Sequence, residues 1–335
     1  MAFWLDIAAF ALKAFLIVAA VGALAALLLR LTRGDRPRPA DIKVRALDER
    51  YDAMRDAVNA QILDKKARKA FAAARKKEFK EAAKARAAGK RVFVLAFKGD
   101  VRAHAVRRLG AEIDAVITAA RPEVDEVVLR IESPGGTVTG YGLAAAQVMR
   151  LRERKIRVTA SVDQVAASGG YLMACAADAI VAAPFAMIGS IGVVAQVPNL
   201  NRLLKRNDID FEEMTAGEFK RSVSMLGEIT PAGREHFRGK LDATHEAFKT
   251  FVAQRRPSLD IARVANGDVW LATEALDLGL VDALSTGDEL LFRARADARL
   301  FEVFAEERKS VLRQLLGGLG FAARLAWTRF VAGAP

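Results

Sequence analysis

The chain has 335 residues, of which 52% are hydrophobic and 27% are charged, and its net charge is +12 at pH 7. This composition excludes an intrinsically disordered chain and allows a sizeable core. The single cysteine, Cys175, excludes an intrachain disulfide, and we interpret it as a small buried hydrophobic residue.

The positive charge is concentrated near the N-terminus. Residues 30–90 carry 19 Lys and Arg against 9 Asp and Glu, a net charge of +10, so the rest of the chain has a net charge of +2. This basic segment follows an apolar run and lacks the aromatic–basic interleaving that stacks nucleic acid bases. The pattern favours a membrane surface, and not a nucleic acid, as its partner.

Residues 7–29 form the apolar run of 23 residues, which is interrupted only by Lys13. At about 1.5 Å per residue it is long enough to cross a bilayer core. A cleaved signal peptide is the alternative, but the run is too long for one and no small-x-small site follows it. We therefore predict a transmembrane helix that anchors the chain, over residues 1–30. Four arginines at positions 30–38 place the body of the protein in the cytoplasm by the positive-inside rule.

Residues 31–90 are predicted to form a basic, helical, membrane-proximal segment. Apolar residues recur in its first half at three- and four-residue steps, which is typical of a coiled coil or a docking helix. These residues are Tyr51, Met54, Val58, Ile62 and Leu63. Beyond residue 65 basic residues dominate, which indicates a solvated helix near lipid headgroups.

Residues 91–298 alternate between apolar strands and amphipathic helices. This repetition predicts an α/β domain with a mostly parallel sheet and helices on its faces. Strands are predicted at 91–97, 126–131, 156–162, 179–183 and 191–194, and helices at 105–119, 138–151, 200–207 and 231–256. Residues 299–335 are predicted to be an amphipathic tail, either an interfacial helix or a helix that packs on a neighbouring subunit.

Ser168 falls where the third of these strands passes into a helix. The sequence at 163–171 is Asp-Gln-Val-Ala-Ala-Ser-Gly-Gly-Tyr. Such a turn exposes a hydroxyl and points backbone N–H groups of the first helical turn at the same place. Acyl transfer needs these two elements, a nucleophile and an oxyanion hole. The alternative is an ordinary serine N-cap followed by a glycine turn. A second glycine turn, Gly135-Gly136, follows the strand at 126–131.

A serine nucleophile also needs a base. None of the histidines, His104, His236 and His245, lies in a glycine-marked loop at a strand end, so we interpret them as ordinary surface or core residues. A lysine can act as the base if it is neutral, and burial lowers the pKa of a lysine. The candidate is Lys220, 52 residues after Ser168; the alternative is one exposed cation among the 52 Lys and Arg.

Four short motifs point to a known family. They are Glu-Ser-Pro-Gly-Gly at 132–136, Val-Ala-Ala-Ser-Gly-Gly-Tyr at 165–171, Ile-Gly-Ser-Ile-Gly-Val at 188–193 and Gly-Glu-Phe-Lys-Arg at 217–221. In this order and at these spacings they resemble the signal peptide peptidase A family of Ser–Lys serine peptidases, with SohB-type members the most similar. The likeness extends from the N-terminal anchor to the tail.

The resemblance implies a role for each matching residue. Ser168 would be the nucleophile and Lys220 the general base. The backbone N–H groups of Gly136 and Gly169 would form the oxyanion hole, and Ser190 would hold the lysine. The implied fold is a ClpP/crotonase-like core of ββα repeats.

The resemblance also implies peptide or protein substrates, contact with membrane lipid, a homo-oligomer, and no cofactor, metal or nucleic acid. It places the catalytic domain on the periplasmic side of the inner membrane, which conflicts with the positive-inside rule. The apolar, glycine-punctuated stretch at 184–197 is consistent with a pocket for small or apolar side chains. Two other functions fit the pattern: a crotonase-like acyl-CoA enzyme, and a membrane scaffold without catalytic activity.

Overall fold

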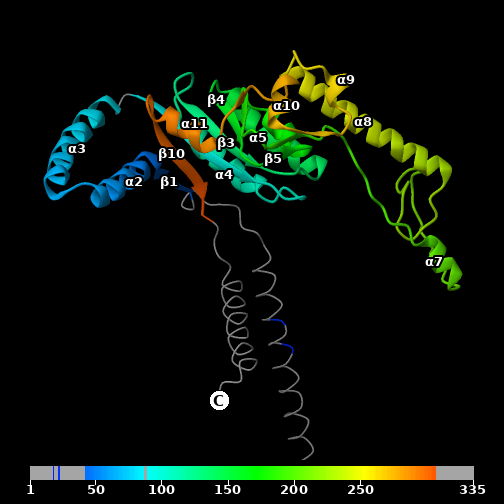
Figure 1. Ribbon diagram of the computed structural model, residues 1–335. Helices are drawn as coiled ribbons and strands as arrows, with labels where there is room; N and C mark the ends of the chain where they lie inside the picture. Colours follow the sequence, from blue (N-terminus) through cyan, green and yellow to red (C-terminus); the bar gives the residue numbers. More distant parts are fainter. Residues whose placement is uncertain (1–17, 19–21, 23–41, 87–88, 307–335) are drawn as a thin grey trace, which may run out of the picture. The chain divides into compact units, whose positions relative to one another are not determined.

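The computed structural model of the protein describes Val18, Gly22, residues 42–86 and residues 89–306 (Figure 1). Residues 42–305 form one compact unit. Apart from Val18 and Gly22, the predicted anchor at residues 1–30 lies outside the described residues, as does the tail beyond residue 306. No helix among the residues that are described is long and apolar enough to cross a membrane.

A seven-stranded mixed sheet forms the centre of the unit and confirms the predicted α/β class with a mostly parallel sheet. Every neighbouring pair is parallel except the edge pair β1–β10. In spatial order the strands are β1 (Ile42–Ala46), β10 (Ala298–Ala305), β2 (Lys90–Lys98), β3 (Glu126–Glu132), β4 (Arg157–Val162), β6 (Ala179–Ala182) and β9 (Ala283–Leu284).

A smaller sheet of three short strands lies at the carboxyl end of the large one. Its strands are β5 (Val165–Ala167), β7 (Met187–Gly189) and β8 (Val269–Leu271). A bridge between Ser133 and Ala166 joins it to the end of β3. The strand predicted at 191–194 is not formed, because the left-handed backbone of Ser190 and its N–H bond to Asp268 O end the pairing.

Helices cover both faces of the large sheet, so its strands are apolar on both sides. Leu95 on β2 and Leu129 on β3 face the larger core, beneath α4 (Val106–Ala119), α5 (Val138–Arg152) and α6 (Gly169–Cys175). Val94 and Leu300 face the opposite side, where α2 (Leu47–Ile62) and α11 (Gly287–Ala294) pack.

The sequence predicted only helices before β2, but the structure also has a strand there. Residues 42–46 form strand β1, which pairs with β10, and only then do α2 and α3 (Lys65–Arg86) follow. Asp48 on α2 is buried and accepts a 3.0 Å hydrogen bond from the N–H of Leu300. The compact unit therefore extends beyond the predicted 91–298 domain at both ends, because the long-range β1–β10 pairing overrides local helix propensity.

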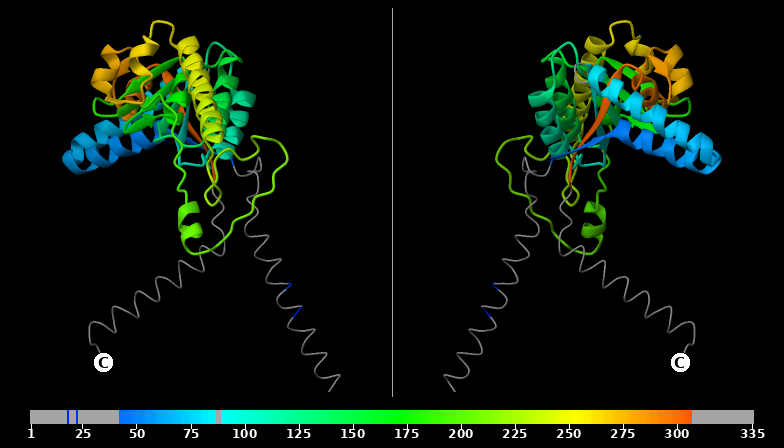
Figure 2. Two further views of the ribbon diagram at one scale, coloured as in Figure 1. Left: turned by 90° about the vertical axis from the view of Figure 1, so that its right-hand side faces the viewer. Right: turned by 90° about the vertical axis from the view of Figure 1, so that its left-hand side faces the viewer.

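The C-terminal half of the unit is dominated by the long helix α8 (Pro231–Arg255), which Thr230 caps by accepting a bond from the N–H of Gly233. Short helices α9 (Ile261–Val264) and α10 (Ala272–Asp277) follow it. Before it, α7 (Asn201–Arg206) and its flanking loops lie beyond the first turns of α8, away from the large sheet, in the views of Figures 1 and 2. We call residues 194–230, which contain α7, the arm.

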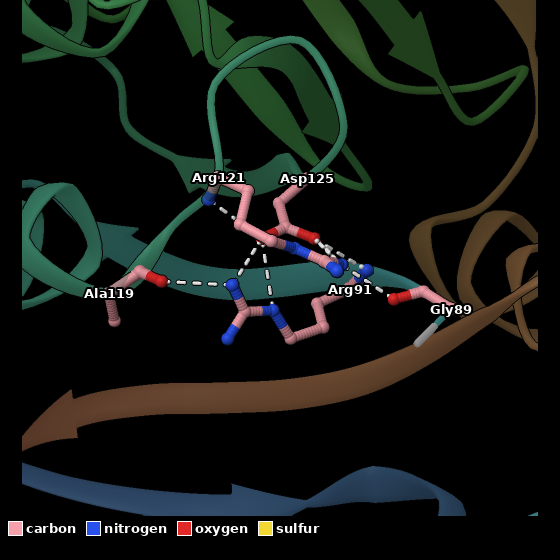
Figure 3. Close-up of polar contacts among 5 residues, drawn as sticks. All are labelled: Gly89, Arg91, Ala119, Arg121 and Asp125. Carbon is pink, nitrogen blue, oxygen red and sulfur yellow. Dashed lines mark hydrogen bonds and ion pairs between the residues drawn. The ribbon is translucent and has the colours of Figure 1, made fainter. Parts of the chain in front are cut away.

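Asp125, Arg91 and Arg121 form a cluster of ion pairs, which we call the clamp, at the amino-terminal ends of the central strands (Figure 3). The buried carboxylate of Asp125 accepts from Arg91 Nη2 at 2.5 Å and from Arg121 Nη2 at 2.7 Å. Burial alone would raise the pKa of Asp125, but the hydrogen bonds from Arg121 and Arg91 hold it well below its usual range. The same arginines bond the carbonyls of Ala119 and Gly89. The clamp thus links the starts of β2 and β3, at the end of these strands opposite to Ser168.

Candidate active site

Ser168 occupies a sharp turn between β5 and α6. Its backbone has φ 51° and ψ −120°, a conformation that L residues seldom adopt. The residue is half-buried, and its N–H donates to the carbonyl of Gly189 at 2.7 Å. It holds the N-cap position of α6, yet its side chain makes no capping hydrogen bond. The strained turn therefore presents the hydroxyl instead of using it as a cap, as nucleophile turns between a strand and a helix do.

The glycine turn at 135–136 packs directly against this serine. Gly135 has φ +92°, and a Cβ there would lie 2.8 Å from Gly169 N and from Ser168 Cβ. A Cβ on Gly136 would lie 2.1 Å from the carbonyl oxygen of Val101. Only glycine fits at either position. Gly135 contacts Gly169 and Ser168 directly, and the predicted oxyanion residue Gly136 follows it in the chain.

Ser190 also lies at this turn. It follows Gly189, whose carbonyl accepts the N–H of Ser168, and its own N–H donates to Asp268 O at 2.6 Å. Ser190 has φ 52° and is half-buried. Within the apolar segment predicted at 184–197, Phe185 and Val194 expose 82% and 81% of their surface.

Lys220 lies elsewhere, on the exposed surface of the arm. Its neighbour Phe219 stacks on His236 of α8, with ring centroids 3.9 Å apart. His245, nine residues further along the helix, contacts the carbonyl of Ile191 at 3.2 Å. These two contacts are about 13 Å apart along α8 at roughly 1.5 Å per residue. Within the described chain no hydrogen bond or ion pair joins Lys220 to Ser168 or Ser190.

The other reactive side chains do not complete the site. His104 is exposed, with Nδ1 2.6 Å from Oδ2 of Asp100, and this hydrogen bond lowers the pKa of Asp100. Burial raises the pKa of the Cys175 thiol to about 12, which agrees with its interpretation as a hydrophobic core residue. Among the described residues no cluster of three or more His, Cys, Asp and Glu side chains could hold a metal ion.

A pocket of about 360 Å³ lies on the other face of the large sheet, away from Ser168. Tyr51 of α2 and Leu291 of α11 form its walls, and Ala96 and Arg130 lie on its floor. The pocket therefore belongs to neither glycine turn.

Sequence reasoning missed two polar residues beneath the glycine turns. Ser133 and Tyr141 are completely buried, and their hydroxyl oxygens are 2.5 Å apart. Ser133 precedes the Pro-Gly-Gly turn, but nothing in the sequence indicates that it meets a tyrosine eight residues later, on a helix. Only the packing of α5 against the turn reveals the pair.

Comparison with known proteins finds matches along most of the chain. Residues 150–300 match the model of peptidase family S49, and residues 2–148 match that of the peptidase family S49 N-terminal region. The "Probable protease SohB" of Haemophilus influenzae is 51% identical over 223 residues, which are 67% of this chain and 63% of that protein. The "Putative protease SohB" of Buchnera aphidicola subsp. Baizongia pistaciae is 37% identical over 94% of both chains.

A more distant relative is the "Serine protease SPPA, chloroplastic" of Arabidopsis thaliana, which is 35% identical over 47% of this chain and 24% of its own length. The two family matches together extend over nearly the whole sequence, and they include the Ser168 turn, the Gly135-Gly136 turn and the arm. The chain therefore belongs to peptidase family S49, a family of serine-type peptidases, as a SohB-type member.

Proposed function

We propose that this chain is a serine endopeptidase in which Ser168 is the nucleophile and Lys220 the general base. The observation that carries the proposal is the Ser168 turn, which has a strained backbone, a hydroxyl unused for capping and Gly135 packed against it. The proposed fold relationship is to the ClpP/crotonase class, in which ββα repeats place such turns at the carboxyl ends of parallel strands.

In the proposed reaction Lys220 Nζ, in its neutral form, takes the proton of Ser168 Oγ as that oxygen bonds to the peptide carbonyl carbon. The N–H groups of Gly136 and Gly169 stabilise the oxyanion of the tetrahedral intermediate. The lysine then returns the proton to the leaving amine as the C–N bond breaks, and water hydrolyses the acyl-enzyme by the same steps. Ser190 would accept a hydrogen bond from the amine and orient it.

We further propose that the base comes from a neighbouring copy of the chain. Lys220 is exposed and out of contact with its own Ser168, and it lies on an arm that exposes large apolar side chains. Among them, Met214 is 90% exposed, Leu203 53% and Met225 52%. Burying these side chains against a second copy in a homo-oligomer would be favourable and would dehydrate the lysine, which favours its neutral form.

The dyad is tested by the variants Ser168→Ala and Lys220→Ala in a peptide-cleavage assay. Each should lower kcat on the order of 10⁴-fold or more, as loss of one member of such a unit does. Two matched controls should retain activity. Lys205→Ala removes an exposed lysine of the same arm, which pairs with Glu228, and Ser258→Ala removes an exposed serine. Full peptidase activity in both dyad variants would exclude this mechanism and favour a scaffold function or acyl-CoA chemistry.

The cellular setting belongs to the same proposal. We place the protein in the inner membrane as a single-pass protein with its anchor at residues 1–30. The basic helix α3 would lie near anionic lipid headgroups, and peptides derived from membrane or envelope proteins would be the substrates. Protease added to one side of sealed vesicles would show which side carries residues 42–305, and thereby decide between the periplasmic and the cytoplasmic placement.

A further inference from the structure

We infer that the buried hydroxyls of Ser133 and Tyr141 form a positioning pair that holds the Gly135-Gly136 turn against Ser168 and so sets the geometry of the oxyanion hole. The inference rests on the proposed function, because it assumes that Ser168 and these glycines carry out acyl transfer. Both hydroxyls are completely inaccessible to solvent, so the pair acts through the two glycine turns and not on a substrate directly.

The hydrogen bonds around the pair have a fixed direction. The single proton of Tyr141 OH goes to the carbonyl of Asp100 at 2.9 Å. In the 2.5 Å contact between the two hydroxyls, Ser133 Oγ must therefore be the donor and Tyr141 OH the acceptor. Ser133 Oγ in turn accepts from the N–H of Gly135 at 3.1 Å. The result is a buried chain from Gly135 N–H through both hydroxyls to Asp100, in which each bond polarises the next.

Ser133 and Tyr141 also contact the nucleophile turn. A Cβ on Gly169 would lie 2.4 Å from Cγ of the Tyr141 ring, and a Cβ on Gly170 would lie 2.5 Å from Ser133 O. Ser133 O accepts the N–H of Ala167 at 3.0 Å, directly before the nucleophile. The pair thus touches both turns, one through its hydroxyls and the other through a ring and a backbone carbonyl.

The surrounding backbone leaves the pair little room to move. A Cβ on Gly99 would lie 2.4 Å from each of the two hydroxyl oxygens, so the backbone of residue 99 packs over their meeting point. The neighbouring carbonyl of Val101 accepts the N–H of Thr137 at 2.8 Å on the far side of the glycine turn. The intact pair is thus fixed in place and holds Gly135 through its N–H. Loss of one hydroxyl would loosen this contact, so we expect the Gly135-Gly136 turn to shift while the sheet remains intact.

The test uses Tyr141→Phe, Ser133→Ala and the double variant in the full chain. Each single variant should lower kcat about 10- to 100-fold, less than complete loss of an oxyanion donor, with KM within about threefold of wild type. Because the two hydroxyls act through one chain, the double variant should be no slower than the slower single variant. Tyr171→Phe is the matched control, since its buried hydroxyl also donates to a carbonyl, that of Leu280 at 2.8 Å.

A second readout separates positioning from general stability. A peptide boronate forms a tetrahedral adduct in the oxyanion hole, whereas the cleaved product peptide binds without one. Tyr141→Phe should weaken boronate binding by the same factor as kcat/KM and leave product binding unchanged. Tyr141→Phe and Tyr171→Phe should lower the melting temperature by similar amounts, since each removes one buried hydroxyl. Tyr171→Phe should leave boronate binding unchanged.

The outcomes distinguish the two proposals. Wild-type activity in Ser168→Ala would overturn the proposed function itself. An inactive Ser168→Ala together with wild-type kcat in folded Tyr141→Phe and Ser133→Ala would overturn only the positioning role. Equal losses of boronate and product binding, or additive losses in the double variant, would also contradict it.

Discussion

At the scale of single residues, position 135 shows how sequence constrains the site. Its φ of +92° disfavours any residue with a Cβ, and that Cβ would also collide with Ala167 O, Gly169 N and the side chain of Ser168. Backbone conformation and close approach are independent requirements, and both are met by glycine alone. An alanine at position 135 therefore tests whether the two turns must remain in contact.

We expect Gly135→Ala to lower kcat/KM about 100-fold or more, because the N–H of Gly136, a proposed oxyanion donor, would move away from Ser168. Gly239→Ala is the control: this helical glycine of α8 has no atom within 4 Å of an added Cβ, so the change should stabilise the protein by up to about 1 kcal/mol. Steady-state kinetics and thermal melting of both variants would measure the difference. Wild-type turnover in Gly135→Ala would show that the contact is not needed.

At the scale of elements, the Asp125 clamp couples strands β2 and β3 to the turn after α4. The carboxylate receives the N–H groups of Arg91 at 2.9 Å and Arg121 at 2.8 Å in addition to both guanidinium groups. Because the pKa of Asp125 is lowered in the folded state, its ionised form stabilises the fold. This contribution is fully present above the unfolded pKa of about 3.9 and is lost as pH falls toward the folded value.

We therefore expect the free energy of unfolding of the wild type to fall as pH is lowered below about 4. Asp125→Asn should be less stable by on the order of 2–3 kcal/mol at neutral pH, because two arginines lose their buried partner. It should also lose less stability on acidification. Denaturant titrations between pH 2 and 7 would check both points against Asp242→Asn, an exposed aspartate of α8. Parallel pH profiles for the wild type and Asp125→Asn would contradict this role of the clamp.

The elements also show where sequence patterns succeed. The predicted strands at 91–97, 126–131 and 156–162 correspond to β2, β3 and β4 within one residue at each end, because strands buried on both faces are nearly continuous apolar runs. The apolar run at 191–194 misled the prediction. Ile191 is completely buried but not in a strand, since burial alone also selects apolar residues.

At the scale of the whole molecule, no hydrogen bond or ion pair within the described chain joins the two residues of the predicted dyad. Ser168 lies at the junction of the two sheets, whereas Lys220 lies on the exposed surface of the arm. If a neighbouring copy supplies the lysine, two inactive variants should restore each other's activity. A copy with Ser168→Ala would still offer Lys220, and a copy with Lys220→Ala would still offer Ser168.

We expect mixed oligomers of Ser168→Ala and Lys220→Ala chains, formed by co-expression, to recover roughly a quarter of wild-type peptidase activity. This value assumes a symmetric homo-oligomer in which two equally abundant chains assemble at random and each serine has one lysine donor. Half of the chains then carry Ser168, and half of their neighbours carry Lys220. The doubly substituted chain mixed with Lys220→Ala is the control and should stay inactive. No recovery in the first mixture, with oligomers confirmed by light scattering, would assign both residues of the dyad to one chain.

The sequence by itself determined the α/β class, the central strands and the glycine turns at Gly135-Gly136 and after Ser168, because apolar periodicity and turn chemistry are local properties. Ser190 was predicted only from the resemblance to a known family. Tertiary structure alone decided that residues 42–46 pair with β10 as a strand, that the hydroxyl oxygens of Ser133 and Tyr141 lie 2.5 Å apart, and that Lys220 lies on an exposed surface. Each of these depends on contacts between elements, and such contacts are set by the packing of the whole chain, which no local pattern encodes.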